Sequence, residues 1–349
     1  MASNPTQYSQ PLPDSLDTIE ALEDVLSCPQ AGLVEALSRL EGDILILGAG
    51  GKVGPTLARM ARRAAPQKKI LAVARFSKSG LRERIQGWGI ETLTCDLLDR
   101  KQVSALPRIP NIIYMAGKKF GTAGQEPVTW AMNVVAPTYV ADHFRDSRIV
   151  AFSTLCVYPF ARVDERGPDE SVPLTPLGEY PNSCVARERV FQYFSHRYVT
   201  LGRIIRLNYA IDVRYGVLHD IATRVRDSRP IDLRTGHANV IWQGDATNQI
   251  LGSLLHCGLP SAPLNIGRSE ASSVREIATA FGKLFGRAPV FEGSEEPMAW
   301  VNDCALACRL FGDPPVSLER MIRWNYDWLR AEMPVYDKPT HYDQRTGVF

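Results

Sequence analysis

The chain has 349 residues, of which 45% are hydrophobic and 22% are charged, values close to those of an average soluble globular protein. Its 40 basic and 38 acidic residues give a formal net charge of +2. This balance argues against nucleic acid as the main partner, because phosphate binding requires a concentrated basic face. The length exceeds one minimal core and fits a large α/β domain with a smaller lobe.

The N-terminal sequence, the apolar segments and the cysteines indicate where the protein is located and whether it holds disulfides or a metal. Residues 1–17 lack the basic region followed by an apolar stretch that marks a secretory signal. No segment approaches the roughly 20 apolar residues of a membrane-spanning helix. The seven cysteines are odd in number and scattered, without a CxxC pair. We therefore expect reduced thiols in a cytoplasmic protein, with neither a membrane segment nor a bound metal.

The first 42 residues are expected to form a helical extension. Residues 1–15 are polar and contain proline, which indicates a mobile arm. Two amphipathic stretches follow over residues 16–26 and 31–40, with apolar positions at helical spacing.

From residue 43 the sequence alternates between strand and helix patterns. Residues 44–47 form an apolar run that is too short for a helix and ends at a glycine, as expected for a buried parallel strand. A helix is expected over residues 52–63. Such alternation predicts a Rossmann-like, doubly wound parallel sheet with helices on both faces. Further strands are expected over residues 69–74, 91–95, 111–115 and 149–153.

A glycine-rich turn joins the first strand to its helix. Its members are Gly48, Gly50, Gly51, Lys52, Val53 and Gly54. Glycine permits the positive φ angles of such a turn and lets the backbone approach a pyrophosphate without an intervening Cβ. The following helix start offers free N–H groups to phosphates. Between a strand and a helix the turn predicts a dinucleotide site, although a glycine turn without a ligand is the alternative.

The pattern becomes less regular after Asn208, where glycine and proline are dispersed. We therefore expect a dinucleotide-binding Rossmann domain over residues 43–208. A smaller C-terminal α/β substrate lobe is expected over residues 209–333, with part of it returning to the Rossmann core. Residues 334–349 are polar and are expected to form a tail that wraps the surface or a partner.

The glycine spacing is GxxGxxG over Gly48, Gly51 and Gly54 instead of the GxGxxG of the standard dinucleotide fingerprint. It resembles the extended short-chain dehydrogenase/reductase family of NAD-dependent epimerase/dehydratase type, which comprises sugar epimerases, dehydratases and reductases. Ordered landmarks extend this resemblance over about residues 43 to 330, including Asp245 and residues 264–267.

The resemblance implies further cofactor residues. Asp96, which is followed by Leu97, occupies the position of the acidic residue that contacts the adenine amine in the family. Asn133 stands where the family places an asparagine in the helix after the fourth strand. The segment that lines the cofactor after that strand would contribute Ala116, Gly117 and Lys118.

The residue after the second strand bears on the choice of nucleotide. An acidic residue there binds the ribose hydroxyls of NAD, whereas an arginine accommodates the 2′-phosphate of NADP. Here Arg75 follows the strand, and Lys78 is a second candidate for charge-assisted bonds to that phosphate. The sequence therefore favours NADP slightly over NAD, with a surface arginine beside NAD as the alternative.

The family's chemistry uses a tyrosine as general acid/base and a lysine four residues later, whose charge lowers the pKa of the tyrosine. The resemblance of residues 152–158 places Thr154 at the catalytic hydroxyl, and that of residues 178–188 places Tyr180 at the tyrosine. The lysine position holds Cys184, which carries no positive charge.

Three interpretations of this departure stay open. In the first, another cation replaces the lysine. Arg187 lies seven residues after Tyr180 and so within about 20° of the same helical face, and Lys118 and Lys119 are alternatives.

In the second interpretation Tyr180 only orients the substrate, and Thr154, Cys184 or an unassigned group transfers the proton. In the third, the protein binds a dinucleotide and performs no chemistry. A nucleophilic Cys184 would require a depressed pKa, and a lone helical cysteine is usually inert.

The substrate is expected between the carboxyl ends of the strands and the smaller lobe. Arginine, asparagine and aromatic side chains suit a polyhydroxylated ligand, although the same residue types occur in any half-buried lobe. The candidates are Phe120, Thr122, Thr154, Asn208, Tyr209, Arg214, Trp242 and Gln243.

These patterns predict an NAD(P)-dependent oxidoreductase or epimerase that acts on a sugar, sugar acid or nucleotide sugar by hydride transfer at a carbinol carbon. The missing lysine motivates an alternative, a catalytically degenerate dinucleotide-binding regulatory or scaffold protein. The resemblance also implies a homodimer paired through the helices that carry Asn133 and Tyr180.

Overall fold

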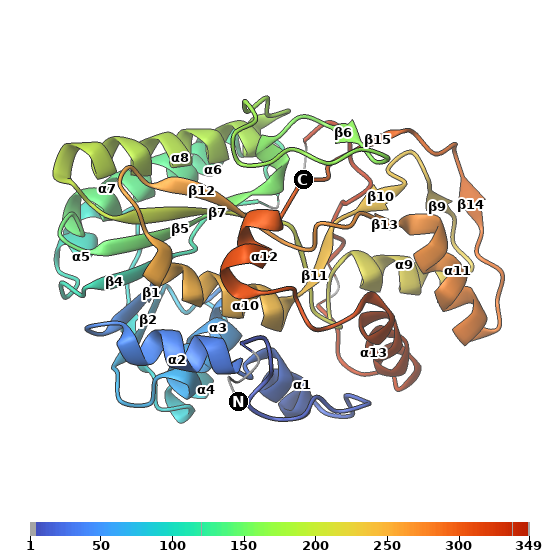
Figure 1. Ribbon diagram of the computed structural model, residues 1–349, viewed down its shortest axis with the longest axis horizontal. Helices are drawn as coiled ribbons and strands as arrows, with labels where there is room; N and C mark the ends of the chain where they lie inside the picture. The colour runs from blue at the N-terminus through green and yellow to red at the C-terminus, as the bar shows by residue number, and fades with distance from the viewer. Residues whose placement is uncertain (1–4, 120, 337, 348–349) are drawn as a thin grey trace.

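The structure is a computed structural model that describes residues 5–119, 121–336 and 338–347 (Figure 1). Its central sheet consists of β1 (Ile44–Leu47), β2 (Ile70–Ala74), β3 (Glu91–Thr94), β4 (Asn111–Tyr114), β5 (Arg148–Thr154), β7 (Gly202–Leu207) and β12 (Ala262–Ile266). These seven strands lie in the order β12-β7-β5-β4-β1-β2-β3, and every pair is parallel. The predicted Rossmann-like sheet is therefore confirmed.

Helices cover both faces of this sheet (Figure 1). Along β1, Ile44 and Ile46 pack toward one layer while Leu45 and Leu47 pack toward the other, as the period of a strand requires. The first layer contains α2 (Ala31–Arg39), α3 (Gly54–Ala64), α4 (Leu81–Gly87), α10 (Gln243–Gly252) and α12 (Ala305–Phe311). The second contains α5 (Arg100–Ser104), α7 (Ala136–His143) and α8 (Glu179–Tyr198).

The helix after the glycine turn begins two residues later than predicted, at Gly54. Val53 is its N-cap residue, and Pro55 occupies the first turn, where a missing N–H costs nothing. The glycine turn therefore extends over the whole interval between the strand and Gly54.

The smaller α/β lobe contains α9 (Val217–Arg226), α11 (Val274–Phe285) and α13 (Leu318–Arg330) around one apolar core that includes Leu218, Phe281 and Trp324. Four short strand pairs complete it and its junction with the sheet domain. They are β8 (Tyr209–Ile211) with β11 (Val240–Trp242), β9 (Ile231–Asp232) with β14 (Phe291–Glu292), β10 (His237–Ala238) with β13 (Ser272–Ser273), and β6 (Ala161–Arg162) with β15 (Met298–Ala299).

Shorter elements connect these layers. A helical segment before α7 combines α6 (Glu126–Trp130) with the π-helix η1 (Ala131–Val135). Two 3-10 turns, η2 (Leu155–Val157) and η3 (Ser253–His256), follow β5 and α10.

The N-terminal extension is packed against the body of the protein. Its helix α1 (Ile19–Leu26) contributes to the core of the lobe. The prediction of a mobile arm is wrong for the part from residue 5, because Tyr8 is buried and its hydroxyl donates to Asp245 of α10. Gln30 also donates to Asp245, at 3.1 Å. Burial raises the pKa of the Asp245 carboxyl to about 7.

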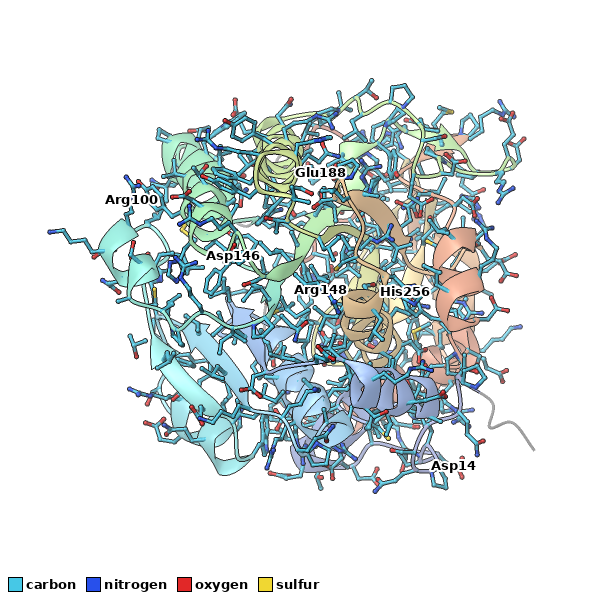
Figure 2. All side chains as sticks on the ribbon, turned by 60° about the vertical axis from the view of Figure 1, so that its left-hand side comes forward. Asp14, Arg100, Asp146, Arg148, Glu188 and His256 are labelled. Carbon is cyan, nitrogen blue, oxygen red and sulfur yellow. The ribbon has the colours of Figure 1, made fainter. Side chains whose placement is uncertain are left out.

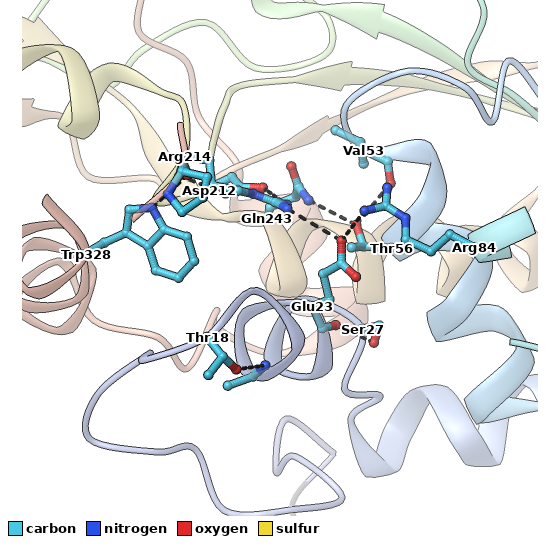
Figure 3. Close-up of polar contacts among 12 residues, drawn as sticks. Thr18, Glu23, Ser27, Val53, Thr56, Arg84, Asp212, Arg214, Gln243 and Trp328 are labelled. Atoms are coloured by element: carbon cyan, nitrogen blue, oxygen red, sulfur yellow. Dashed lines mark hydrogen bonds and ion pairs between the residues drawn. The ribbon is translucent and has the colours of Figure 1, made fainter. Parts of the chain in front are cut away.

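A second contact ties the extension to the rest of the chain (Figure 3). Glu23 of α1 accepts a hydrogen bond from Arg84 at 2.8 Å and pairs with Arg214 at 3.5 Å. Arg214 also donates to Asp212 at 2.6 Å. The extension therefore contacts both the sheet domain and the lobe through one carboxylate.

The C-terminal tail lies along the lobe. The backbone N–H of Tyr336 donates to the Arg214 carbonyl at 3.0 Å, and that of Thr340 donates to Asp220 at 2.8 Å. Tyr342 is almost fully buried in the core of the lobe. The tail thus packs on the lobe through α9 and the segment that follows β8.

All seven cysteines are free thiols. Within the described residues, no helix is both long and apolar enough to cross a bilayer, and no cluster of three histidine, cysteine or carboxylate side chains could hold a metal ion.

Candidate dinucleotide site and reactive centre

A cavity of about 260 Å³ opens at the carboxyl ends of β1, β2, β3 and β4. Strand order reverses between β1 and β4, and open parallel sheets bind ligands at such a switch point. The cavity is lined by Gly48, Gly50, Gly51, Ala74, Arg75, Phe76, Ser77, Lys78, Leu81, Cys95, Asp96, Leu97, Met115, Ala116, Gly117 and Met132.

Glycine geometry makes this cavity possible. Gly48 has a φ of +93°, and a Cβ there would lie 2.6 Å from the backbone nitrogen of Ala116. No other residue fits at this position without moving the end of β4. Gly50 and Gly51 form the adjoining wall, so a ligand can touch the backbone itself. The cradle fits a pyrophosphate held by the turn and by the start of α3.

Polar side chains surround the other end of the cavity. Arg75 is exposed at the rim, and Asp96 is half-buried with its carboxylate accepting the Leu98 N–H at 3.0 Å. Sequence reasoning missed Phe76, Ser77 and Met132, which also line the cavity. The first two follow the second strand directly, so their position was a usable signal.

The remaining predicted cofactor residues lie beside the cavity. Lys52, Val53 and Gly54 continue the glycine turn into α3. Asn133, fully buried on η1, accepts from the Lys118 N–H at 3.0 Å and donates to Ser183 at 2.8 Å. Asn133 therefore joins the loop after β4 to the helix α8.

Helix α8 carries the predicted reactive residues and brings Arg187 to Cys184. The Arg187 guanidinium contacts the Cys184 sulfur at 3.0 Å and donates to the Ala116 carbonyl at 3.1 Å. All three side chains, Tyr180, Cys184 and Arg187, are buried. Burial raises the pKa of the Tyr180 phenol well above its usual value, Cys184 adds to the rise, and Arg187 opposes it.

Burial also raises the pKa of the Cys184 thiol, and Arg187 opposes that rise. The sulfur therefore remains a protonated thiol at neutral pH, and the structure provides no activated nucleophile at this position. Arg187 supplies a permanent positive charge at 3.0 Å from this sulfur, on the helical face that the sequence predicted.

A second group of side chains includes Tyr180, and we call it the lysine–tyrosine cluster: Lys52, Lys119, Tyr180, Tyr209 and Tyr215. The Lys119 ammonium lies 6.0 Å from the ring centroid of Tyr180 and 5.9 Å from that of Tyr209. The Lys52 ammonium lies 2.9 Å from the ring centroid of Tyr215. Sequence reasoning missed Tyr215, which lies in the irregular part of the lobe without a local signal.

Thr154 ends β5 and is buried beside this centre. Its hydroxyl oxygen accepts the Cys156 N–H at 3.3 Å and so caps η2. The hydroxyl hydrogen is not used by this bond.

A buried network fixes α8 against the sheet. Glu188, labelled on α8 in Figure 2, accepts from Ser153 at 2.6 Å and pairs with Arg206 of β7 at 2.8 Å. Arg206 donates further to Tyr158 at 2.6 Å. The position of Tyr180 relative to β5 therefore depends on charges that are fully enclosed by protein.

The predicted substrate residues separate into two groups. Tyr209 belongs to the lysine–tyrosine cluster, Thr154 ends β5, and the buried Thr122 lies on the segment that follows β4. Asn208, at the end of β7, donates to Asn302 at 2.8 Å. Phe120 lies outside the described residues.

For the second group the structure corrects the expectation of a substrate contact. Trp242 is fully buried in the lobe core against Trp324, with ring centroids 4.9 Å apart. Gln243 is buried and donates to Thr56 of α3 at 3.1 Å (Figure 3). Arg214 is buried and paired with carboxylates. These three side chains connect parts of the protein to one another.

Comparison with known proteins agrees with this architecture. Residues 44–211 match the model of the NAD dependent epimerase/dehydratase family, which confirms the resemblance recognised in the sequence. A search of curated proteins finds no match.

Several solved structures have the same fold. The UDP-glucose 4-epimerase of Thermus thermophilus in complex with NAD is 19% identical, with a TM-score of 0.68 over 82% of this chain and 99% of that chain. MoeE5 in complex with UDP-glucuronic acid and NAD is 20% identical, with a TM-score of 0.68 over 84% and 100%. The UDP-glucuronic acid 4-epimerase from Bacillus cereus is 17% identical, with a TM-score of 0.68 over 82% and 99%.

Proposed function

We propose that the protein is an NAD(P)-dependent oxidoreductase or epimerase, because residues 44–211 match the model of the NAD dependent epimerase/dehydratase family. Its substrate would be a sugar, sugar acid or nucleotide sugar that reacts by hydride transfer at a carbinol carbon. The observation that carries this proposal is the glycine-walled cavity at the switch point of the sheet, which ends close to the helix of Tyr180.

The residues of the cavity fit a nicotinamide dinucleotide. Gly50 and Gly51 would present backbone to the pyrophosphate, and Asp96 would meet the adenine. When bound, the nicotinamide would supply the hydride acceptor or donor. Arg75 at the rim favours NADP, because its guanidinium can hold a 2′-phosphate, whereas the similar structures described above hold NAD.

In this proposal Tyr180 moves the proton at the reacting oxygen of the substrate. Its raised pKa keeps the phenol protonated at neutral pH, so it is prepared to donate toward a carbonyl oxygen. Thr154 would orient the same oxygen through the hydroxyl hydrogen that its cap of η2 does not use.

We infer that Arg187 supplies the charge that the lysine supplies elsewhere in the family. It lies behind Cys184, at 3.0 Å from the sulfur, and it already opposes the rise in the pKa of Tyr180. A guanidinium keeps its charge even when buried, so the phenolate would be stabilised throughout the turnover.

A specific observation supports a second candidate function, a dinucleotide-binding protein without turnover. The Arg187 guanidinium lies 2.6 Å from the point where a Cβ on Gly117 would be, so it occupies space at the end of the cavity. In this case the cavity would bind the cofactor while the reactive centre stays blocked.

The first experiment is calorimetric titration of the cofactor-stripped protein with NAD, NADP and their reduced forms. We expect dissociation constants of about micromolar for one pair, followed by turnover in a panel of sugars and sugar acids. Binding without any turnover would favour the second function. Failure to bind all four nucleotides would overturn both.

We also propose a homodimer paired through the face formed by α6, η1 and α8. Large apolar side chains remain exposed there, including Val128, Trp130, Val135 and Tyr193, of which Tyr193 is 55% exposed. Such a patch is typical of protein–protein interfaces.

A further inference from the structure

A second cavity, of about 190 Å³, lies between the N-terminal extension and the helices α10 and α12, and we call it the extension cavity. Leu33 and Ala36 of α2 line one side of it, and Phe311 of α12 lines another. All of its lining residues lie outside residues 44–211, which match the family model, and none of them lines the dinucleotide cavity. The proposed function therefore leaves this cavity unexplained.

Gln249 of α10 lines the extension cavity with an amide oxygen that the protein leaves unused. The residue is 3% exposed, and among the described residues its Oε1 has no hydrogen-bond partner. The neighbouring Asn248 contrasts with it, because its Oδ1 accepts the Gln30 N–H at 2.7 Å and its Nδ2 donates to the Gly244 carbonyl at 2.9 Å. Buried polar groups rarely lack a partner unless a water or a ligand supplies it.

The Gln249 amide can present its oxygen and its nitrogen to a ligand. The terminal torsion of glutamine has a broad energy profile, so the amide turns at little cost. A carboxamide offers an acceptor next to a donor. This pair matches the edge of a base that carries a donor next to an acceptor, as when glutamine binds N6 and N7 of adenine.

Two aromatic rings form a further wall of the cavity. The Phe311 ring packs on the backbone at Gly252, where a Cβ would lie 3.0 Å from ring carbon Cε1. It also meets the ring of His256, labelled in Figure 2, edge to face, with centroids 5.3 Å apart and an interplanar angle of 81°. Aromatic rings held in this way offer a planar ligand a surface for stacking.

The charges around the cavity favour a neutral ligand. Glu35 and Arg39 of α2, which both line it, pair with each other at 3.1 Å. Burial and, to a lesser degree, Arg203 lower the pKa of His256, so its ring is neutral at neutral pH. The cavity is also smaller than the roughly 300 Å³ at which pockets for drug-sized ligands begin, so it fits a single ring system.

From this arrangement we propose that the extension cavity binds a small neutral heteroaromatic base, such as a free purine, whose hydrogen-bonding edge pairs with the Gln249 amide and whose ring stacks on Phe311. The N-terminal extension would then serve as one wall of a second ligand site. This inference goes beyond the proposed function and does not depend on it.

The test compares adenine with benzimidazole, which keeps the fused rings but lacks the amino group. Both are titrated by calorimetry into the full chain in an excess of NAD and NADP, so that the adenine end of the dinucleotide cavity is occupied. We expect adenine to bind about tenfold more tightly, since a pair of hydrogen bonds contributes about this factor. In Gln249→Leu, which keeps most of the side-chain volume, this advantage should be lost while the affinity for benzimidazole stays unchanged.

Two further variants keep the result specific. Ala36→Phe fills the cavity from α2 and should weaken the binding of both probes. Gln86→Leu replaces an exposed glutamine of α4, outside the cavity, and should bind both probes like the parent protein. Thermal unfolding of every variant reports on folding separately from binding.

Equal affinities of the parent protein for adenine and benzimidazole, or no binding of either, would overturn this inference and leave the cavity to water. Adenine binding that stays unchanged in both Gln249→Leu and Ala36→Phe would assign the base to another part of the protein, and would also overturn it. None of these results bears on the proposed function, which the dinucleotide titration tests separately.

Discussion

The dinucleotide cavity and the reactive centre are built in different ways. The cavity is defined largely by the backbone of one local strand–turn–helix unit, in which Gly48, Gly50 and Gly51 leave room for a ligand. The reactive centre instead depends on long side chains from distant segments, such as Arg187 on α8 and Lys119 after β4.

This difference suggests how such a site can change. Backbone geometry cannot be replaced residue by residue, because any Cβ at Gly48 would meet β4. A positive charge can be supplied from several directions. Cys184 can therefore stand in place of the family's lysine, because other cations are close to Tyr180. Mutations in the dinucleotide cavity should therefore change cofactor affinity, and mutations in the reactive centre should change turnover, independently of each other.

Tyr180→Phe is expected to show the largest difference between the effect on turnover and the effect on dinucleotide binding. If the phenol transfers the proton, turnover should fall by about 10²- to 10⁴-fold, the usual contribution of a general acid/base. The affinity for the dinucleotide, measured by cofactor fluorescence, should change little because the tyrosine lies beyond the cavity. Unchanged turnover would remove Tyr180 from the chemistry.

The converse change is Gly48→Ala. A methyl group at a φ of +93°, facing the Ala116 backbone, should lower dinucleotide affinity by about 100-fold through strain and displacement. Gly87→Ala is the matched control, because a Cβ at that α4 position meets nothing within 4 Å. If the two variants bind the dinucleotide equally well, the turn is not the binding element.

Arg75→Ala tests a smaller effect within the cavity. Loss of the guanidinium at the rim should weaken NADP binding by about tenfold and leave NAD binding unchanged, because only NADP carries the 2′-phosphate. Parallel titrations with the two nucleotides measure this directly. An equal loss for both would assign Arg75 to a feature that they share, such as the adenine.

The smallest effect concerns Lys52, whose backbone belongs to the turn and whose side chain belongs to the cluster. Its pKa of about 7 means that the ammonium is charged below this pH and neutral above it. If the Lys52 charge contributes tenfold to binding of the dinucleotide's diphosphate, the affinity for NAD should therefore fall about fivefold between pH 6 and pH 8. In Lys52→Gln the same titration should be flat over this range.

Local patterns predicted the fold and the cavity well. The apolar run at residues 44–47, the glycines after it and Asp96 each lie within a short unit whose structure follows from its own residues. Long-range contacts could not be derived in this way. The partner of Tyr8 is 237 residues away, and Tyr336 reaches Arg214 only because the tail folds back over the lobe.

Residue type alone also could not predict which side chains of the lobe face the reactive centre. Trp242 ends a strand, as a substrate-stacking residue would, but it packs against Trp324 in the core. An aromatic side chain at such a position has the same sequence pattern in both roles. Tyr215, which does lie beside a lysine of the centre, has no neighbour in sequence that distinguishes it.

The docking of the N-terminal arm has a consequence for how the chain is made. Tyr8 binds Asp245, and the backbone N–H of Gln30 donates to Asn248 at 2.7 Å. During synthesis on a ribosome, both acceptors emerge long after the arm itself, since translation proceeds from the N-terminus. The N-terminal arm therefore cannot dock until α10 has been synthesised, and the contact between the arm and α10 forms in the late steps of folding.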